Sequence, residues 1–393
     1  MSTSIVTKRA CIVRQGNYPY DLLVRREAEA LASDGFEVDV ICQHSSKDPA
    51  EEVINGVHVY RLPIRLNRDG VIPYVAGYVW FFFLAAYKLT VLHLRHRYSI
   101  VQVNTLPDFL VFATLIPRLL GAKVGLVMYE PMPELWATLY HKRLIVRPLE
   151  IIQRLAIGYA NVVFAVTQQQ KETFVARGAN ADKIAVMLNV PDTRVWEHLV
   201  PERVDTGNEH FTLICHGRIE ERYGHDTIVQ AVNMVKDHIP NLRLRVLGNG
   251  YYVDEFLAQV KALGLETHVQ YLGWVSLQKM VEELCCADVG IVAQKASPYS
   301  NLVHTGKMYD YLAFGKPVLA SRLGAVRAYF DEHALYFFEP GDAVSLARGI
   351  LDLWQHPEKR RAMVENSQRL YDQYRWEKQR EIYLSTYRAA LCI

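Results

Sequence analysis

Cysteine is scarce in this chain of 393 residues. Its six cysteines are spread along the sequence, and no two of them have the C-x-x-C spacing. This pattern is typical of reduced, buried thiols and argues against a disulfide framework or a zinc site. The first residues, MSTSIVTKRAC, lack an apolar segment long enough for a signal peptide, so we expect a cytoplasmic protein.

Several catalytic and nucleotide-binding motifs are absent as well. The sequence contains no D-x-D pair, and therefore no obvious carboxylate clamp for a divalent metal on a nucleotide. It contains no Walker A, H-E-x-x-H or G-x-S-x-G motif. The absence of G-x-G-x-x-G after the first predicted strand disfavours an NAD-dependent dehydrogenase. A net charge of +2 does not indicate a nucleic-acid partner.

Strand-like and helix-like patterns alternate in both halves of the chain. Strands are expected at Arg9–Arg14, at Val57–Leu62 after a turn at Asn55-Gly56, and at Phe211–His216, and a helix is expected at Phe109–Leu120. This alternation predicts parallel sheets covered on both faces. A polar stretch without apolar periodicity, 191–210, separates the halves. We therefore expect an α/β protein with two doubly wound, Rossmann-like domains, 1–195 and 211–374, joined by a linker at 196–210. Ligands of such sheets bind beyond the carboxyl ends of the strands, and the cleft between the domains is the expected place.

The segment SNLVHTGKMYDYLAFGKPVLAS, residues 300–321, contains the first candidate site. A short helix is expected to begin near Gly306, and its free N–H groups and positive dipole end suit a phosphate. Lys307 adds a mobile charge, and Asp310 lies one turn further on, where it could accept two hydroxyls of a ribose. The competing interpretation is an ordinary surface ion pair between Lys307 and Asp310.

The segment CHGRIEERYGHD, residues 215–226, contains the second. Gly217 turns the chain after a predicted strand, and Arg218 and Arg222 follow, so the two arginines could clamp a pyrophosphate. They could equally pair with the two glutamates of the same loop. A third segment, VLGNGYY, has Gly248 and Gly250 after a strand, but G-x-G without a third glycine is a poor dinucleotide fingerprint and more often a structural turn.

An uncharged run, Val71 to Tyr87, raises the question of a membrane. It is followed by Lys88, Arg95 and Arg97. One interpretation is a helix packed on a sheet, because buried helices also read as apolar runs. The other is a helix lying in a membrane interface beside a basic rim. A transmembrane span is the least favoured, since the run is short and contains a proline and a glycine.

Taken in order, the segments resemble a retaining glycosyltransferase of the GT-B fold, family 4 type (glycosyl transferases group 1). The resemblance covers nearly the whole chain. Its C-terminal pieces are HGRIEERYGHD (216–226), RVLGNGYY (245–252), VQYLGWV (269–275), CADVGIV (286–292) and HTGKMYDYLAFGKPVLAS (304–321). Its N-terminal pieces are GFEVDVIC (35–42), NGVHVYRLP (55–63), NTLPDFLVF (104–112), GAKVGLVMYEPMPEL (121–135) and FAVTQQQ (164–170). The tail at 375–393 is similar to the family's last helix, which crosses back to the N-terminal domain.

The resemblance implies a site for a nucleoside-diphosphate sugar in the C-terminal domain and an acceptor site on the N-terminal domain, facing each other across a cleft. The residues that it implies for catalysis are Arg218, Lys307 and Glu130. Those implied for donor binding are Gly217, Arg222, Gly248, Gly250, Val275, Thr305, Gly306 and Asp310, with Asp310 on the ribose and the base near Gly248, Gly250 and Val275. Those implied on the acceptor side are Gly16, Asn17 and Asn104. No metal and no other cofactor is expected.

The sequence departs from the family pattern at several of these places. Leu302 stands where the family signature has its first Glu, and Asp310 replaces the second. Tyr223 replaces a lysine beside Arg222. Asn104 and Tyr129 stand where related sequences often have histidines. These departures put in doubt the usual contact to the hydroxyls of the donor sugar.

The function that we expect is metal-independent, retaining transfer of a sugar to a lipid-linked acceptor, in bacterial surface polysaccharide or glycolipid assembly. The protein would lie on the inner face of the membrane through residues 71–97. A catalytically silent relative that binds a nucleotide-sugar or a partner glycosyltransferase remains open. A nucleotide-sugar epimerase shares the architecture, but we find no convincing acid/base pair for it.

Overall fold

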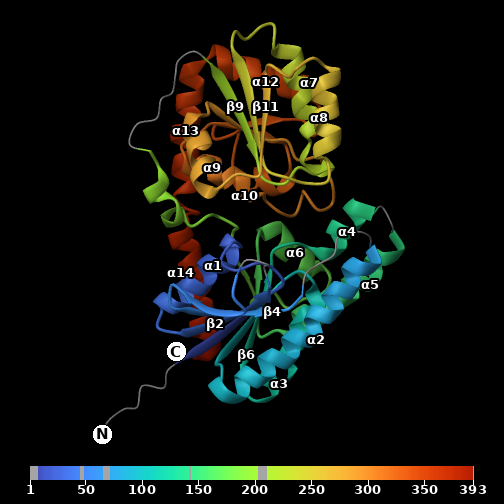
Figure 1. Ribbon diagram of the computed structural model, residues 1–393, viewed down its shortest axis with the longest axis vertical. Coiled ribbons are helices and arrows are strands. Elements are labelled where there is room, and N and C mark those ends of the chain that lie inside the picture. The colour runs from blue at the N-terminus through green and yellow to red at the C-terminus, as the bar shows by residue number, and fades with distance from the viewer. Residues whose placement is uncertain (1–7, 45–47, 65–70, 141–142, 202–209, 393) are drawn as a thin grey trace. The chain divides into compact units, whose positions relative to one another are not determined.

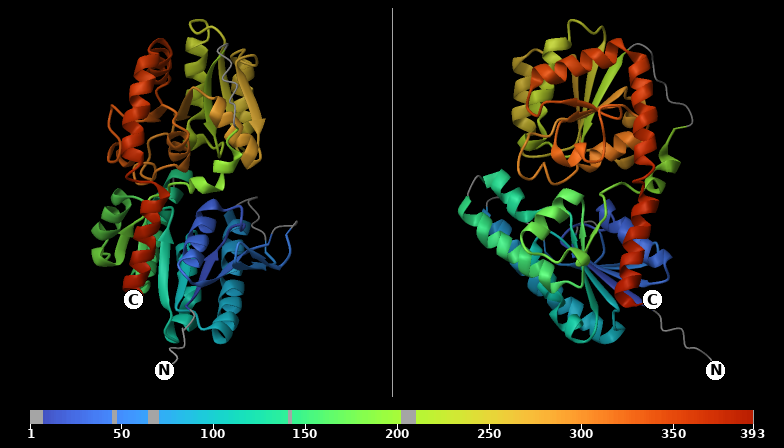
Figure 2. Two further views of the ribbon diagram at one scale, coloured as in Figure 1. Left: turned by 90° about the vertical axis from the view of Figure 1, so that its left-hand side faces the viewer. Right: turned by 180° about the vertical axis from the view of Figure 1, so that it is seen from behind.

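The computed structural model describes residues 8–44, 48–64, 71–140, 143–201 and 210–392. The chain forms two compact units (Figure 1). Unit 1 comprises Met1–Asn189 together with Glu377–Ile393, and unit 2 comprises Val190–Trp376. The units therefore divide at 189/190 and 376/377, where the sequence analysis set boundaries at 195 and 374. Both are parallel-sheet, Rossmann-like α/β units, with helices on both faces of each sheet (Figure 2).

Unit 1 is built on a sheet of eight strands in the order β3-β4-β2-β1-β5-β6-β7-β8. Its described strands pair in parallel apart from β3, which runs antiparallel to β4 through a turn at Asn55-Gly56. The sequence predicts this turn but not the strand before it. The strands are β1 (Arg9–Arg14), β2 (Glu37–Gln43), β3 (Glu51–Ile54), β4 (Val57–Leu62), β5 (Ile100–Asn104), β6 (Lys123–Met128), β7 (Val162–Ala165) and β8 (Ile184–Val186).

The apolar run of unit 1 lies within one long helix, α2 (Val71–His96). Its buried residues, among them Phe81, Ala85 and Leu89, pack into the core beneath the sheet, as the interpretation of a sheet-packed helix requires. The segment predicted as a helix over 109–120 is instead a 3-10 helix, η1 (Asp108–Thr114), followed by a short α3 (Leu115–Leu119). The other helices of this half are α1 (Leu22–Ser33), α4 (Met132–Tyr140), α5 (Arg143–Tyr159) and α6 (Gln168–Ala176), with a 3-10 turn η2 at Ala181–Lys183.

Unit 2 has a sheet of six parallel strands in the order β11-β10-β9-β12-β13-β14. The strands are β9 (Phe211–His216), β10 (Leu242–Leu247), β11 (Val269–Gly273), β12 (Val289–Val292), β13 (Val318–Ser321) and β14 (Tyr336–Phe338). The helices are α7 (His225–Val235), α8 (Val253–Ala262), α9 (Leu277–Cys286), α10 (Gly306–Ala313), α11 (Gly324–Arg327), α12 (Ala343–Gln355) and α13 (Pro357–Tyr371), with a 3-10 turn η5 at Glu221–Tyr223. The order of the strands reverses direction at β9, which is where doubly wound sheets bind ligands.

Part of the expected linker is packed rather than free. Two 3-10 turns, η3 (Thr193–Val195) and η4 (Glu197–Leu199), flank Trp196, which is buried. The Trp196 ring lies 5.8 Å from the ring of Phe314, and it packs on Val281 of α9. The apolar indole therefore fixes this stretch to unit 2. The rest of the expected linker, 202–209, lies outside the described residues.

The tail forms two helices, since α13 ends at Tyr371 and α14 (Trp376–Leu391) begins five residues later. The helix α14 belongs to unit 1 (Figure 1). Its Tyr383 and Tyr387 hydroxyls both donate to Gln102 Oε1 on β5, at 2.6 and 2.7 Å. Gly125 on β6 makes room for this helix, because a Cβ there would lie 2.0 Å from the Tyr387 hydroxyl.

The helix α10 is held by its inner face. Met308, Tyr309, Tyr311 and Leu312 are buried at helical spacing, which leaves the other face for polar residues. The Tyr309 hydroxyl lies 2.7 Å from Nδ1 of His304, and Nε2 of His304 lies 2.6 Å from the carbonyl oxygen of Ala325. Because a carbonyl oxygen can only accept, Nε2 carries the proton and Nδ1 accepts from Tyr309. Burial lowers the pKa of His304 to about 4.

This buried imidazole makes the stability of unit 2 depend on pH. An unfolded histidine binds a proton below a pH of about 6.5, whereas His304 stays neutral until about 4, so acidification between these values favours unfolding. His304→Gln, which keeps a donor for Ala325 but does not titrate, should flatten the decline by up to about 1.4 kcal/mol per pH unit. Urea unfolding between pH 7 and pH 4.5 measures both slopes.

His216 and His225 remain in this variant, and burial lowers the pKa of each to about 3, so they supply the same background slope in both proteins. Equal slopes for the wild type and His304→Gln would contradict a lowered pKa of His304 in the folded protein. An NMR titration of the His304 ring in the wild type provides the same test without a substitution.

Candidate functional site

Residues from both predicted segments of unit 2 meet at the carboxyl ends of its strands. The chain leaves β9 at His216, turns at Gly217 and continues into Arg218. Lys307 stands in the first turn of α10, and its Nζ lies 3.4 Å from the carbonyl oxygen of Arg218. The two candidate segments are therefore one site, which we call the cationic site and define by Arg218, Arg222 and Lys307.

Three glycines make the close packing of the loops at this site possible. Gly217 has φ +101°, and a Cβ there would lie 2.6 Å from Cε of Lys307. Gly248 has φ +129°, and a Cβ there would lie 1.7 Å from the carbonyl oxygen of Gly217. A Cβ at Gly250 would lie 2.0 Å from the carbonyl oxygen of Ile219. The G-x-G turn is therefore required by the packing of two loops, as its structural interpretation predicts.

The two arginines of the cationic site share one acidic partner. Arg222 Nε donates to Glu220 Oε2 at 2.8 Å, and Arg218 Nη1 lies 3.6 Å from Glu220 Oε1. Arg222 also lies over the rings of Tyr223 and Tyr299, at 4.8 and 4.9 Å from their centroids. The side chain of Arg218 is 52% exposed, so Arg222 is fixed and Arg218 is the one that can turn toward a ligand.

Lys307 is held over an aromatic ring rather than by a carboxylate. Its Nζ lies 4.1 Å from the centroid of the Tyr223 ring, a cation–π contact. Burial lowers the pKa of Lys307, while the nearby Glu220 and Asp310 act in the opposite direction. Tyr223, a departure from the family pattern, thus supports the lysine that the sequence analysis proposed for the phosphates.

Asp310 faces into the unit, toward the end of β9. Its Oδ2 lies 3.4 Å from Nε2 of His216. Burial raises the pKa of Asp310 to about 7, although the charge of Lys307 pulls it down. Burial and Lys307 lower the pKa of His216 to about 3, so this imidazole is neutral near pH 7. The expected surface ion pair is thus a partly buried arrangement of three groups.

The remaining donor-side predictions lie around the same edge of the sheet. Thr305 is the residue before α10, and its side chain makes no capping hydrogen bond. Gly306 is the exposed first residue of that helix. Val275 follows β11 and is half-buried, beside Trp274, which is exposed. The N–H of Gly248 donates to the carbonyl oxygen of Gly273 at 2.7 Å, which ties the end of β11 to the G-x-G turn.

The acceptor-side predictions all lie at the carboxyl ends of strands in unit 1. Gly16 and Asn17 follow β1, and Asn17 Oδ1 accepts from Gln43 Nε2 at 2.9 Å. Glu130, which the resemblance implies for catalysis, follows β6 at the same edge and is half-buried. Asn104 ends β5 but is fully buried, with its amide committed to other side chains. Asn104 therefore supports this edge of the sheet from beneath, and a direct contact with an acceptor does not follow from its position.

The partners of Asn104 form a closed hydrogen-bond network around buried Glu27 of α1. Glu27 accepts from Gln102, Asn104 and Tyr129, each at 2.7 Å. The other amide hydrogen of Gln102 goes to Asn104 Oδ1, and the other amide hydrogen of Asn104 goes to the Tyr129 hydroxyl. With the bonds from Tyr383 and Tyr387, every polar hydrogen of these side chains has an acceptor. In this arrangement Glu27 only accepts hydrogen bonds, as a carboxylate does.

Burial raises the pKa of Glu27, while Arg26 and the three donors lower it. Asn104 and Tyr129, which stand in place of histidines of related sequences, thus form a matched neutral pair. Both substitutions are visible in the sequence, but no sequence pattern pairs them with Glu27.

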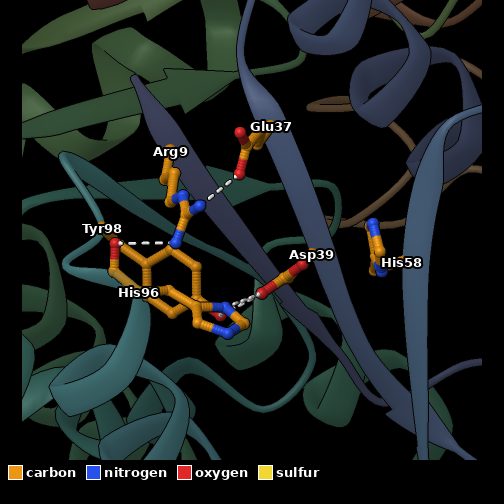
Figure 3. A pocket seen from close by; sticks show the side chains of 6 residues that line it. All are labelled: Arg9, Glu37, Asp39, His58, His96 and Tyr98. Carbon is orange, nitrogen blue, oxygen red and sulfur yellow. Dashed lines mark hydrogen bonds and ion pairs between the residues drawn. The ribbon is translucent and has the colours of Figure 1, made fainter. Parts of the chain in front are cut away.

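A separate pocket of about 190 Å³ opens in unit 1 at the amino ends of β1, β2 and β4 (Figure 3). It is lined by Arg9, Glu37, Asp39, His58, His96 and Tyr98. Asp39 accepts from the Tyr98 hydroxyl and lies 3.0 Å from His96 Nδ1, while Arg9 pairs with Glu37 at 2.7 Å. Its charged groups satisfy one another, and it lies at the opposite end of the strands from the acceptor-side predictions.

Two further residues of the cationic site were missed from the sequence. His216 faces Asp310, and Tyr311 fixes α10 to β9 because its hydroxyl accepts from the His216 N–H at 3.2 Å. An added Cβ at Gly290 would lie 2.4 Å from the Tyr311 ring, so this glycine provides the space for it. In the part of the chain that the structure describes, no three His, Cys, Asp or Glu side chains are arranged to hold a metal ion.

Comparisons with known proteins agree with this division of the chain. Residues 201–370 match the family of glycosyl transferases group 1, and residues 23–189 match the glycosyl transferase 4-like domain. The two matches follow unit 2 and unit 1 closely.

Individual relatives are distant. A GDP-mannose-dependent monoacylated alpha-(1-6)-phosphatidylinositol monomannoside mannosyltransferase of Corynebacterium glutamicum is 26% identical over 153 residues, 38% of this chain and 40% of that protein. The match therefore spans less than half of that relative's length. Sucrose-phosphate synthase from Thermosynechococcus elongatus has a TM-score of 0.76 at 17% identity, over 98% of this chain and 99% of that one.

Anabaena HepE, in complex with UDP-glucose, has a TM-score of 0.71 at 16% identity, over 97% of this chain and 99% of that one. Likenesses at such identity establish the fold. With the two family matches and the two Rossmann-like units, they identify the chain as a glycosyltransferase of the GT-B fold that belongs to the glycosyl transferases group 1.

Proposed function

We propose that this glycosyltransferase transfers a sugar from a nucleoside diphosphate to a lipid-linked acceptor, with retention at the anomeric carbon and without a metal ion. The observation that carries the proposal is the geometry of the cationic site. Nζ of Lys307 lies 3.4 Å from the carbonyl oxygen of Arg218, next to the place where Gly217 packs against Gly248. The N–H groups in the first turn of α10 point to the same edge of the sheet and lack partners within the helix. This is a suitable site for a diphosphate.

The chemistry needs charge stabilisation above all. As the bond between the anomeric carbon and the phosphate oxygen breaks, the leaving diphosphate gains negative charge. Lys307, Arg218 and Arg222 would stabilise that charge in the role that a metal ion has in other enzymes. Glu220, which partners both arginines here, would release Arg218 to the ligand.

No protein side chain is needed as a base to remove the proton of the acceptor hydroxyl. The acceptor hydroxyl would attack from the face that the phosphate leaves, and its proton would pass to the departing phosphate oxygen. The new bond then has the configuration of the old one. Asp310 would accept hydroxyls of the ribose, and because its pKa is about 7, this recognition is strongest above that pH.

The named relatives support the choice of substrates. HepE is described in complex with UDP-glucose, and the Corynebacterium protein is named for GDP-mannose and a phosphatidylinositol mannoside. A nucleoside-diphosphate sugar is common to both names. We propose a lipid-linked saccharide as the acceptor and bacterial surface polysaccharide or glycolipid assembly as the setting.

A lipid-linked acceptor requires access to a membrane, and residues 71–97 are the proposed contact on its inner face. The structure refines which residues to test. Phe81 is fully buried in the core of unit 1 and Phe82 is half-buried, whereas Trp80, Phe83 and Tyr87 are exposed. Substituting the buried ring would unfold the unit rather than probe a membrane.

Removing the lysine of the cationic site should abolish most of the donor affinity. Lys307→Ala is expected to weaken binding of the preferred nucleoside diphosphate by about 10- to 100-fold, because a charge-assisted hydrogen bond contributes about 1.5–3 kcal/mol. Isothermal titration with UDP, GDP, ADP and dTDP, with and without EDTA, measures it. EDTA should not change the affinity.

Lys236→Ala is the matched control. Lys236 follows the C-terminal end of α7, which lies at the opposite edge of the sheet because the helix returns antiparallel to the strands. Equal affinities for Lys307→Ala and the wild type would show that the phosphates bind elsewhere, and a requirement for Mg²⁺ would contradict the metal-independent mechanism.

The role of Asp310 can be separated from that of the phosphates. Asp310→Asn keeps the shape but loses the carboxylate, so it should reduce the preference for a ribonucleoside diphosphate over its 2′-deoxy form by about tenfold. In the wild type, the same preference should decline as the pH falls from 8 to 6, since Asp310 takes up its proton near 7. A preference unaffected by Asp310→Asn would make Asp310 a structural partner of His216 alone.

A further inference from the structure

Unit 1 exposes a broad apolar surface on three helices. We call it the apolar face and define it by Trp80, Phe83 and Tyr87 of α2, Leu119 of α3, and Ile151 and Leu155 of α5. Each of these side chains is between 58% and 73% exposed. Large apolar side chains that gather on one surface mark a contact with another molecule or with a membrane.

The helix α2 has apolar residues on both sides. Phe81, Ala85 and Leu89 are fully buried on the side that meets the sheet. At 100° per residue, Trp80, Phe83 and Tyr87 point in the opposite direction. A helix on the surface of a soluble protein has polar residues there.

The helix α5 repeats the arrangement. Gln153, Ala156 and Ile157 are buried, and Ile151 and Leu155 lie on the opposite side. Since α2 and α5 pack into the same core cluster, their outer sides point away from the same face of the sheet. The 3-10 helix η1 packs against both of them, and its Phe112 ring lies 5.2 Å from the Tyr159 ring at the end of α5.

Side-chain contacts join α3 and the 3-10 helix before it to the two longer helices. Arg118 of α3 lies over the ring of Tyr159 at the end of α5, 4.1 Å from its centroid. Phe109, in the 3-10 helix before α3, lies 6.0 Å from the Phe82 ring of α2. Leu119 thus belongs to the same surface, which extends well beyond residues 71–97.

A transmembrane position of α2 conflicts with the fold. Val75–His96 is long and apolar enough to cross a membrane. Four of its apolar side chains, Phe81, Ala85, Leu89 and Leu92, are nevertheless buried at 3% exposure or less in the core of unit 1. Removing α2 into a bilayer would expose the sheet beneath, so the folded unit can only lie against a membrane.

The charges around the apolar face indicate which partner fits. Exposed arginines surround it: Arg95 and Arg97 near the end of α2, Arg118 on α3, and Arg147 and Arg154 on α5. Of the four acidic residues between 71 and 160, Asp108 and Glu134 are buried, Glu130 is half-buried beyond the carboxyl end of β6, and Glu150 pairs with Arg177 at 3.1 Å. A second copy of this surface would bring like charges together, whereas anionic lipid headgroups would neutralise them.

We propose that α2, α3 and α5 form one docking face that lies in the headgroup region of an anionic bilayer. The apolar face enters the boundary of the acyl chains, and the arginines contact the headgroups. The proposal rests on the proposed function for the lipid-linked nature of the acceptor, and it adds α3 and α5 to the contact. Docking itself is measured without donor or acceptor.

The experiment is flotation of the purified full chain with vesicles of phosphatidylcholine, with and without one third phosphatidylglycerol. Ile151→Gln combined with Leu155→Gln should lower the bound fraction at least about tenfold, since two large apolar side chains no longer enter the bilayer. Arg147→Glu with Arg154→Glu should remove the preference for anionic vesicles. Each lost arginine should weaken binding to these vesicles by about fivefold. Met234→Gln, an exposed apolar residue of unit 2, is the control and should float like the wild type.

Three results would overturn the docking face: no flotation of the wild type, flotation of the Ile151/Leu155 variant at the wild-type level, or light scattering that shows a dimer which this variant dissociates. Circular dichroism and the thermal midpoint verify that each variant is folded. Nucleoside-diphosphate binding is recorded on the same samples. A wild type that floats but binds no nucleotide would refute the proposed donor site and leave the docking face intact.

Discussion

The cationic site depends on one backbone contact, the approach of Gly217 to Gly248. No side chain fits there, because a Cβ at residue 248 would lie 1.7 Å from the Gly217 carbonyl oxygen. The contact joins the carboxyl ends of β9 and β10. The side chain of Lys307 packs directly against Gly217, because a Cβ there would lie 2.6 Å from Cε of Lys307. A side chain at either glycine would displace the lysine from its position over Tyr223. The position of the Lys307 ammonium group therefore depends on the lack of a side chain at Gly217 and Gly248.

In unit 1, the corresponding constraint is the burial of a carboxylate. Removing one partner from a buried charge is strongly destabilising, so Glu27 requires its donors from β5 and β6. Tyr383 and Tyr387 of α14 complete the network by occupying Gln102. The carboxyl ends of β5 and β6, the first helix and the last helix are thus parts of one hydrogen-bonded arrangement. Asn104 and Tyr129 fit this network, because each of their polar hydrogens donates a hydrogen bond within it.

Much of the fold follows from sequence periodicity, since alternating apolar strands and amphipathic helices are local patterns. The strand Arg9–Arg14 and the strand Phe211–His216 have the predicted bounds. Short or exposed elements were missed, such as β3, whose stability comes from its pairing with β4. The segment 109–120 was predicted as one helix, and η1 with α3 stands there, because the packing of Leu110 and Val111 beneath α2 outweighs local helix propensity.

The site was predictable to the extent that its residues are close in sequence. Gly217, Arg218 and Arg222 occupy one short loop, and Lys307 and Asp310 occupy one helix. Their convergence follows from the rule that parallel strands present their carboxyl ends at one edge. His216 facing Asp310 and Tyr223 beneath Lys307 are contacts across the sheet, which no spacing encodes.

The apolar run at 71–87 shows why two interpretations of one sequence need not exclude each other. A helix buried on one side and a helix docked on a membrane are both apolar, and a helix with both contacts is apolar all round. Periodicity is lost in such a helix, so the sequence offers no sign of which residues face which environment. The structure separates them, because Phe81 is fully buried and Trp80, its neighbour, is 59% exposed. The helix α5 shows the same separation, because Ala156 and Ile157 are buried and Ile151 and Leu155 are exposed on the opposite side.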